Sequence, residues 1–256
     1  MFEDYALTNK LRSVNTELKL FFGLGSLLLC VFSPSPLTPI LIALTMAIVL
    51  ILFAEIKARF YLKILTIPLS FGVISSLIIM FMYGRGDILL SFEIFGKVFD
   101  INRDGANLSV LVLSRMFGGV SCLFFIALTT PMVEMFAVFK RLKVPDAFLE
   151  LSMMIYRYIF VFLDEALMIH TAQTMRHGYN GIKNSIRSFS MLGSVLFVRA
   201  WERGENLIVS MDSRCYNGKL DVLRVERSLS PVLLGVVIFY EVVMGVISYL
   251  TSHLMG

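Results

Sequence analysis

The stretch LTIPLSFGVISSLIIMFMY, residues 65–83, holds nineteen consecutive uncharged residues and indicates the class of this protein. About 20 mostly apolar residues form a helix long enough to cross the hydrocarbon core of a bilayer. The composition of the 256-residue chain agrees, because 57% of its residues are hydrophobic and only 16% are charged, against roughly 25% charged residues in soluble domains. These figures exclude a disordered chain, a disulfide scaffold and a nucleic-acid-binding arm. We therefore expect an integral membrane protein.

Four further apolar runs flank this stretch. They cover residues 18–33, 37–54, 106–128 and 229–250. Pro34 and Pro36 separate the first two runs, since proline interrupts a helix. The sequence therefore predicts an all-α integral membrane protein with about five transmembrane helices. Four lie in an N-terminal membrane region, residues 1–130, and the fifth forms a C-terminal transmembrane helix, residues 229–256.

The distribution of Lys and Arg predicts the orientation of these spans. With a cytoplasmic N-terminus, 19 of the 23 cations fall on the cytoplasmic side, thirteen of them within residues 131–228. Cytoplasmic loops of membrane proteins carry an excess of Lys and Arg, and the short loops agree, with six cations inside and three outside. The outer loop, residues 84–105, alternates apolar and polar side chains as a short β-hairpin does.

Arg115 lies about ten residues into the run at 106–128. An Arg at the centre of a bilayer costs about 2.5–3.5 kcal/mol on insertion scales, so such a residue faces a partner or the interior of the helix bundle. Two interpretations stay open: a contact with a second membrane subunit, or a hydrogen bond within this chain.

Residues 131–228 form the one large cytoplasmic segment, and its periodicity predicts two or three long helices. Pro131 opens a first helix, a long helix runs from Asp146 to about Met175, and another covers residues 185–213. The second helix is about 45 Å long at 1.5 Å per residue. Charged residues within its apolar half favour a helix packed on other helices near the interface, although a sixth, tilted span over residues 146–180 is the alternative. We expect this segment to be a coupling domain.

The last two of these helices end alike. One closes with Met175-Arg176-His177-Gly178-Tyr179-Asn180-Gly181 and the other with Ser213-Arg214-Cys215-Tyr216-Asn217-Gly218. Each Arg follows a small residue, Ala172 or Ser210, by four positions and so shares its helix face. An Arg on the last turn is favoured by the helix dipole, and a Gly in each ending can take the left-handed conformation that closes a helix. Two matching endings 38 residues apart favour a pair of exposed docking sites over ordinary helix stops.

The sequence resembles a known family in its runs Thr129-Thr130-Pro131, Leu142-Lys143-Val144-Pro145, Tyr156-Arg157-Tyr158, Ala172 to Gly178 and Arg214. This family is the transmembrane T component of energy-coupling factor (ECF) transporters. The opening residues Asp4-Tyr5-Ala6, Leu11-Arg12 and Lys19-Leu20 are most similar to its cobalt/nickel branch, the CbiQ-type permeases. The resemblance covers nearly the whole chain and is most specific in the pair of Ala-x-x-x-Arg-Gly motifs. The sequence departs from that pattern because His177 is inserted before Gly178, Ser210 replaces Ala, and Cys215 replaces Gly.

The resemblance implies a multi-pass protein of a prokaryotic plasma membrane that works with two cytoplasmic ATPase subunits and a membrane substrate-capture subunit. Arg176 and Arg214 would each engage one ATPase, with Ala172, Gly178 and Ser210 completing the two motifs. The chain would link ATPase movement to the capture subunit, for cobalt in the first place, while nickel or a vitamin stays open as the substrate.

The sequence predicts no catalytic, cofactor or metal site in the chain itself. It has no Gly-rich phosphate loop and no His, Cys and carboxylate cluster at ligand spacing, and His170 and His177 are two helical turns apart. ATP and Mg²⁺ are therefore expected on the partner subunits. The competing classes are an intramembrane enzyme, which needs polar catalytic groups at membrane depth, and a self-sufficient secondary transporter, which needs polar midplane sites in repeated halves.

Overall fold

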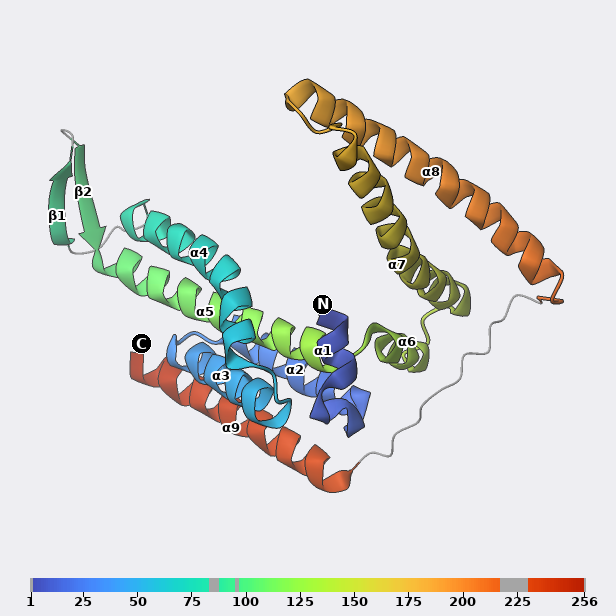
Figure 1. Ribbon diagram of the computed structural model, residues 1–256. Coiled ribbons are helices and arrows are strands. Elements are labelled where there is room, and N and C mark those ends of the chain that lie inside the picture. Colours follow the sequence, from blue (N-terminus) through green and yellow to red (C-terminus); the bar gives the residue numbers. More distant parts are fainter. Residues whose placement is uncertain (1, 83–87, 95–96, 217–229, 256) are drawn as a thin grey trace. The chain divides into compact units, whose positions relative to one another are not determined.

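The computed structural model describes residues 2–82, 88–94, 97–216 and 230–255, which form long helices and one β-hairpin (Figure 1). The all-α class predicted from the sequence is confirmed, with the hairpin as an addition in the outer loop. The chain divides into two compact units. The first comprises Met1–Met135 with Val225–Gly256, and the second comprises Phe136–Arg224.

The first unit contains most of the helices. In chain order they are α1 (Phe2–Thr8), the 3-10 turn η1 (Lys10–Ser13), α2 (Thr16–Phe32), α3 (Leu37–Ile48), the π-helical turn η2 (Val49–Phe53), α4 (Ala58–Met82), α5 (Arg103–Thr129) and α9 (Pro231–Met255). The hairpin between α4 and α5 consists of β1 (Ile88–Ile94) paired antiparallel with β2 (Lys97–Asn102), so the predicted hairpin is confirmed. A further helix, α6 (Met132–Arg141), follows α5 along the chain.

Among the described residues, three helices are long and apolar enough to cross a membrane: α4, α5 and the part Pro231–Thr251 of α9. The runs at 18–33 and 37–54 also form helices, but α2 is only 17 residues long and Leu37–Phe53 is a shorter apolar helix. Three of the five predicted spans thus meet this length and composition. α4 begins at Ala58 rather than at residue 65, because Arg59 and Lys63 end the apolar run without ending the helix. The long stems of such cations can lie along apolar surface.

Helix α5 is the centre of the first unit, where it packs against α1, α2, α3 and α4. Close packing depends on Gly118, since a Cβ there would lie 2.9 Å from the carbonyl oxygen of Pro39 and still nearer to the Cys30 sulfur. Small residues let helices approach closely in membranes, where lipid gives little hydrophobic drive for association. The Tyr61 hydroxyl also donates to Ser121 Oγ at 3.0 Å, which ties α4 to α5.

The second unit is built on α7 (Asp146–Met175) and α8 (Ile182–Asp212), two antiparallel helices joined by a short turn (Figure 1). α7 has the predicted bounds and is not among the three helices that qualify as spans. α8 begins at Ile182 rather than at residue 185, because Gly181, with φ 82°, redirects the chain immediately before it. Although α8 is rich in apolar side chains, none of its residues is buried.

Candidate functional site

The turn that ends α7 presents Arg176. The Gly178 amide donates to the Gln173 carbonyl at 2.8 Å, and the His177 amide donates to the Thr174 carbonyl at 3.0 Å. These two bonds make a Schellman motif, in which the residue after the helix end is left-handed. His177 is that residue, with φ 57°. Arg176 therefore holds the last position of the helix, near the negative end of its dipole.

The turn that ends α8 repeats this geometry. The Tyr216 amide donates to the Met211 carbonyl at 3.1 Å, and the Cys215 amide donates to the Asp212 carbonyl at 3.0 Å. Cys215 is left-handed, with φ 57°. Arg214 thus stands where Arg176 stands in the first turn, and both arginines are presented by the same backbone structure.

The left-handed residues that close the two helices are His177 and Cys215 rather than the glycine that the sequence predicts for each ending. Gly178 has a different role, since a Cβ there would lie 2.8 Å from Ser188 Oγ and 3.0 Å from the Gln173 carbonyl oxygen. In the second turn Tyr216 occupies the equivalent position. His177 and Cys215 are therefore matching residues of the two turns rather than an insertion in one and a replacement in the other.

The members of each predicted motif lie together, but the two motifs lie far apart. Ala172 and Arg176 are exposed at one end of the helix pair, beside the half-buried Gly178, and Ser210 and Arg214 are exposed at the other end. α8 has 31 residues, which is about 46 Å at 1.5 Å per residue. The helix pair therefore offers two similar exposed arginines at its opposite ends, and their docking role stays a prediction.

Polar contacts connect α7 with α8, or with the turn that follows α8, at both ends of the helix pair. Next to Arg176, Gln173 Nε2 donates to the Ser188 carbonyl at 3.0 Å, Ser188 Oγ donates to the Gly178 carbonyl at 2.7 Å, and the Tyr179 hydroxyl donates to Gln173 Oε1 at 2.7 Å. Next to Arg214, the Tyr216 hydroxyl donates to Glu150 Oε2 at 2.7 Å. This hydrogen bond raises the pKa of Tyr216 because it stabilises the protonated phenol.

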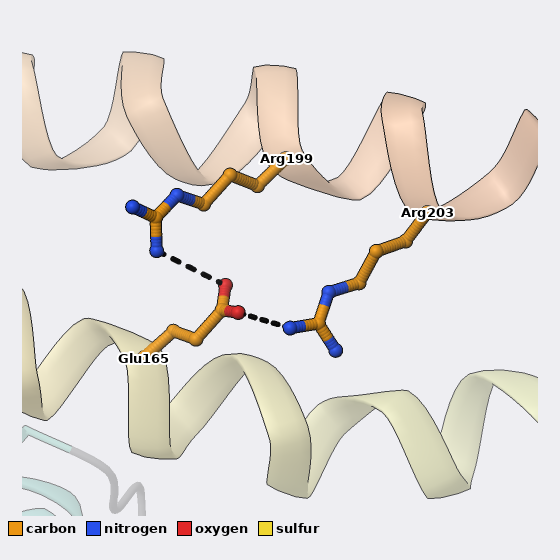
Figure 2. A network of polar contacts seen from close by, with 3 residues as sticks. All are labelled: Glu165, Arg199 and Arg203. Carbon is orange, nitrogen blue, oxygen red and sulfur yellow. Dashed lines mark hydrogen bonds and ion pairs between the residues drawn. The ribbon is translucent and has the colours of Figure 1, made fainter. Parts of the chain in front are cut away.

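Between the two ends, Glu165 of α7 bridges to two arginines of α8 (Figure 2). Its Oε1 accepts a hydrogen bond from Arg203, and its Oε2 lies 3.8 Å from Arg199 Nη1. The Glu165 side chain is 10% exposed, whereas those of Arg199 and Arg203 are 48% and 40% exposed. The sequence analysis did not single out Glu165. The available signal was a carboxylate in an apolar helix and two arginines spaced four residues apart on the next helix.

The guanidinium group of Arg115 finds its hydrogen-bond acceptor within the chain. Its Nε and Nη2 both donate to the Ser33 carbonyl oxygen, at 3.1 and 2.7 Å, so that α5 holds the residue that ends α2. This is the internal hydrogen bond of the second interpretation. A contact of Arg115 with another membrane subunit stays a prediction.

A cluster that the sequence analysis missed surrounds the end of α5. Lys19 is 2% exposed and its Nζ donates to the Thr129 carbonyl at 3.1 Å, while Asn9 Nδ2 donates to the Leu128 carbonyl at 2.9 Å. Thr16 Oγ1 donates to Glu134 Oε2 at 2.7 Å. The N-terminal segment therefore fixes the place where α5 ends and the chain continues to the second unit.

Among the residues that the structure describes, no group of three or more His, Cys, Asp or Glu side chains could hold a metal ion. His170 instead lies against the Tyr179 ring, with ring centroids 4.6 Å apart. The predicted docking residues thus lie on exposed turns at the ends of α7 and α8.

Comparison with known proteins identifies the family. The family model of the cobalt transport protein CbiQ matches residues 8–223. The chain is 42% identical to a fused cobalt transport protein, CbiMQ, of Methanocorpusculum labreanum, over 96% of this chain and 41% of that longer relative. It is 38% identical to an uncharacterized protein of Methanocaldococcus jannaschii, over 98% of this chain and 93% of the relative.

A third relative is the energy-coupling factor transporter transmembrane protein EcfT of Ruminiclostridium cellulolyticum, 30% identical over 68% of this chain and 67% of the relative. These matches confirm the resemblance that the two arginine motifs and the N-terminal residues indicated. The chain belongs to the CbiQ family of cobalt transport proteins and, with it, to the transmembrane components of energy-coupling factor transporters.

Proposed function

We propose that this chain couples ATP hydrolysis on two cytoplasmic partner ATPases to the movement of a membrane substrate-capture subunit. The observation that carries the proposal is the pair of matching turns, each with an exposed Arg at a helix end, at the two ends of one helix pair. Two equivalent subunits bind most simply to two equivalent surfaces. ATP and Mg²⁺ bind the ATPases in this proposal, and the N-terminus and the second unit lie in the cytoplasm.

We propose that the apolar faces of α7 and α8 bind the capture subunit. Large apolar side chains stay exposed there, among them Ile155, Ile159, Leu163 and Leu167 on α7 and Phe189, Phe197, Trp201 and Val209 on α8. Large exposed apolar patches mark protein or membrane interaction sites. The proposed substrate is cobalt, which the family description and the fused relative both name; nickel and vitamins are the alternatives.

The docking proposal is tested by reversing the charge of each arginine in the complete complex in liposomes. Arg176→Glu and Arg214→Glu should each abolish ATP-dependent cobalt uptake and weaken retention of the ATPases, while the chain still inserts. Arg187→Glu is the matched control, since Arg187 is exposed on α8 but lies outside both turns. Unchanged uptake in both variants would rule the docking role out.

The substrate and the need for partners are tested in the same liposomes. Cobalt should accumulate only with ATP and all subunits, and an equal concentration of nickel should not compete. Preferred uptake of nickel or a vitamin would overturn the cobalt assignment. Uptake by this chain alone would instead favour a self-sufficient secondary transporter.

A further inference from the structure

Two glutamates of α7 make polar contacts with α8 and the turn that follows it. No residue of α8 is fully buried, and apolar side chains such as Leu192, Leu196 and Leu207 are only half-buried, so apolar packing restrains its angle to α7 only in part. The buried residues of α7 are Leu149, Glu150 and Glu165. Both glutamates contact residues on or directly after α8: Glu150 accepts a hydrogen bond from Tyr216, and Glu165 pairs with Arg199 and Arg203.

We propose that Glu165 is a positioning residue that sets the angle between α7 and α8, and through it the orientation of the turn with Arg176, at the end of α7, relative to the turn with Arg214, at the end of α8. The proposal rests on the docking function proposed above. Glu165 suits this role because it lies between the two tied ends, and its two carboxylate oxygens face two different arginines one helical turn apart (Figure 2). A contact to two successive turns of α8 restrains both the distance and the rotation of that helix, which a single hydrogen bond does not.

The burial of Glu165 makes the bridge strong relative to surface ion pairs. Exposed pairs contribute little because water screens them and their long side chains lose entropy. A carboxylate that is only 10% exposed has given up much of its hydration, so loss of either the charge or its partner leaves an unfavourable buried group. Arg203 is further held over the Phe162 ring, with Cζ 5.7 Å from the ring centroid.

The angle between the helices can be measured by electron paramagnetic resonance between two spin labels. One label goes on the native Cys215, which is exposed while Cys30 and Cys122 are buried, and the other on Ala147→Cys, at the exposed start of α7. Glu165→Gln should broaden and shift the distance distribution between the labels. Asp164→Asn removes the same charge from the exposed neighbouring residue and should leave the distribution unchanged.

The effect on coupling is measured with unlabelled variants in the complete complex. Glu165→Gln and Arg203→Gln should each lower ATP-dependent uptake several-fold, and the double variant should be no worse than Glu165→Gln alone, since Glu165→Gln already removes the contact with Arg203. Arg199→Gln should have the smaller effect, because its contact is the longer one at 3.8 Å. If Glu165→Gln fails to insert, the distance distribution and the uptake are both measured on Arg203→Gln, since Arg203 is half-exposed.

The outcomes separate this proposal from the docking function. An unchanged distance distribution in Glu165→Gln, with uptake still lost in Arg176→Glu, overturns the positioning role alone. A changed distribution with normal uptake also overturns it, because the relative orientation of the two turns then does not matter. Normal uptake in both Arg176→Glu and Arg214→Glu overturns the docking function, and the positioning role falls with it.

Discussion

His177 and Cys215 each hold a backbone conformation that their residue type disfavours. Both have φ 57°, and the left-handed region costs a non-glycine residue roughly 1–2 kcal/mol. The cost is incurred twice, in the two turns that present the arginines. The same strained closure therefore fixes the direction in which the chain leaves each helix directly after the Arg.

Substitutions at His177 should separate the backbone requirement from the imidazole. Glycine removes the left-handed cost but adds about 0.5–1 kcal/mol of chain entropy, so His177→Gly should keep the turn or stabilise it slightly. His177→Val should open it, because β-branched residues are outliers at positive φ. Hydrogen exchange of the Gly178 amide measures this opening. Protection that is equal in the Val and Gly variants would contradict the expectation, and Cys215→Val serves as the control that leaves the first turn unchanged.

The sequence placed both arginines at helix ends but gave the left-handed position to a glycine, whereas His177 and Cys215 take it. Glycine is favoured there because it lacks a Cβ. The structure instead uses Gly178 for its missing side chain, because the Gln173 carbonyl and Ser188 Oγ lie too near for a Cβ. The contact with Ser188 comes from α8, fifteen residues after Gln173 in sequence. No local sequence pattern therefore indicates it.

At the scale of the helices, periodicity predicted the bounds of α7 correctly and those of α8 to within three residues at its start. It could not predict how the two helices meet. Glu165 contacts Arg199 and Arg203 only because the turn at residues 176–181 sets the register of the hairpin. The apolar side chains of α8 are at most half-buried, among them Leu196 and Leu207, so the second unit covers them only in part.

The bond between Tyr216 and Glu150 makes the far end of the helix pair sensitive to alkaline pH. The bond raises the pKa of Tyr216 above the ordinary value of a tyrosine. A raised pKa means that the folded state favours the protonated phenol, so the contact is intact below about pH 10 and is lost as the pH rises through the folded-state pKa. Glu150→Gln should therefore lower the pKa of Tyr216.

An ultraviolet difference titration of wild-type protein against Tyr216→Phe isolates this phenol, and repeating it in the Glu150→Gln background gives the shift. Glu202→Gln, an exposed carboxylate on α8, should leave the titration of Tyr216 unchanged. A Tyr216 pKa that is the same with and without the Glu150 carboxylate would show that the hydrogen bond does not form in solution.

At the scale of the whole molecule, the chain passes from the first unit to the second just after α5, and the N-terminal segment holds that point. From the sequence, Lys19 is one of the predicted cytoplasmic cations and part of the resemblance to the CbiQ-type branch, with no structural role assigned to it. Its actual place, buried against the end of α5, depends on α2 and α5 packing side by side, although Lys19 and Thr129 are 110 residues apart. A buried Lys is costly unless it is paired, and carbonyl groups at a helix C-terminus are suitable partners because the helix dipole is negative there.

Lys19→Met should therefore destabilise the first unit, while Lys10→Met should not. Hydrogen bonds to charged groups contribute about 1.5–3 kcal/mol, and methionine leaves the Thr129 carbonyl without its buried donor. Lys10 pairs with Glu55 where both side chains are more than half exposed, and such pairs contribute about 0–1 kcal/mol. Thermal unfolding of the two variants in detergent gives the comparison, and equal melting temperatures would contradict the role of Lys19. Because Lys19 holds the end of α5 from which the chain leaves for the second unit, Lys19→Met should also lower ATP-dependent uptake in the complete complex at temperatures where the chain is still folded.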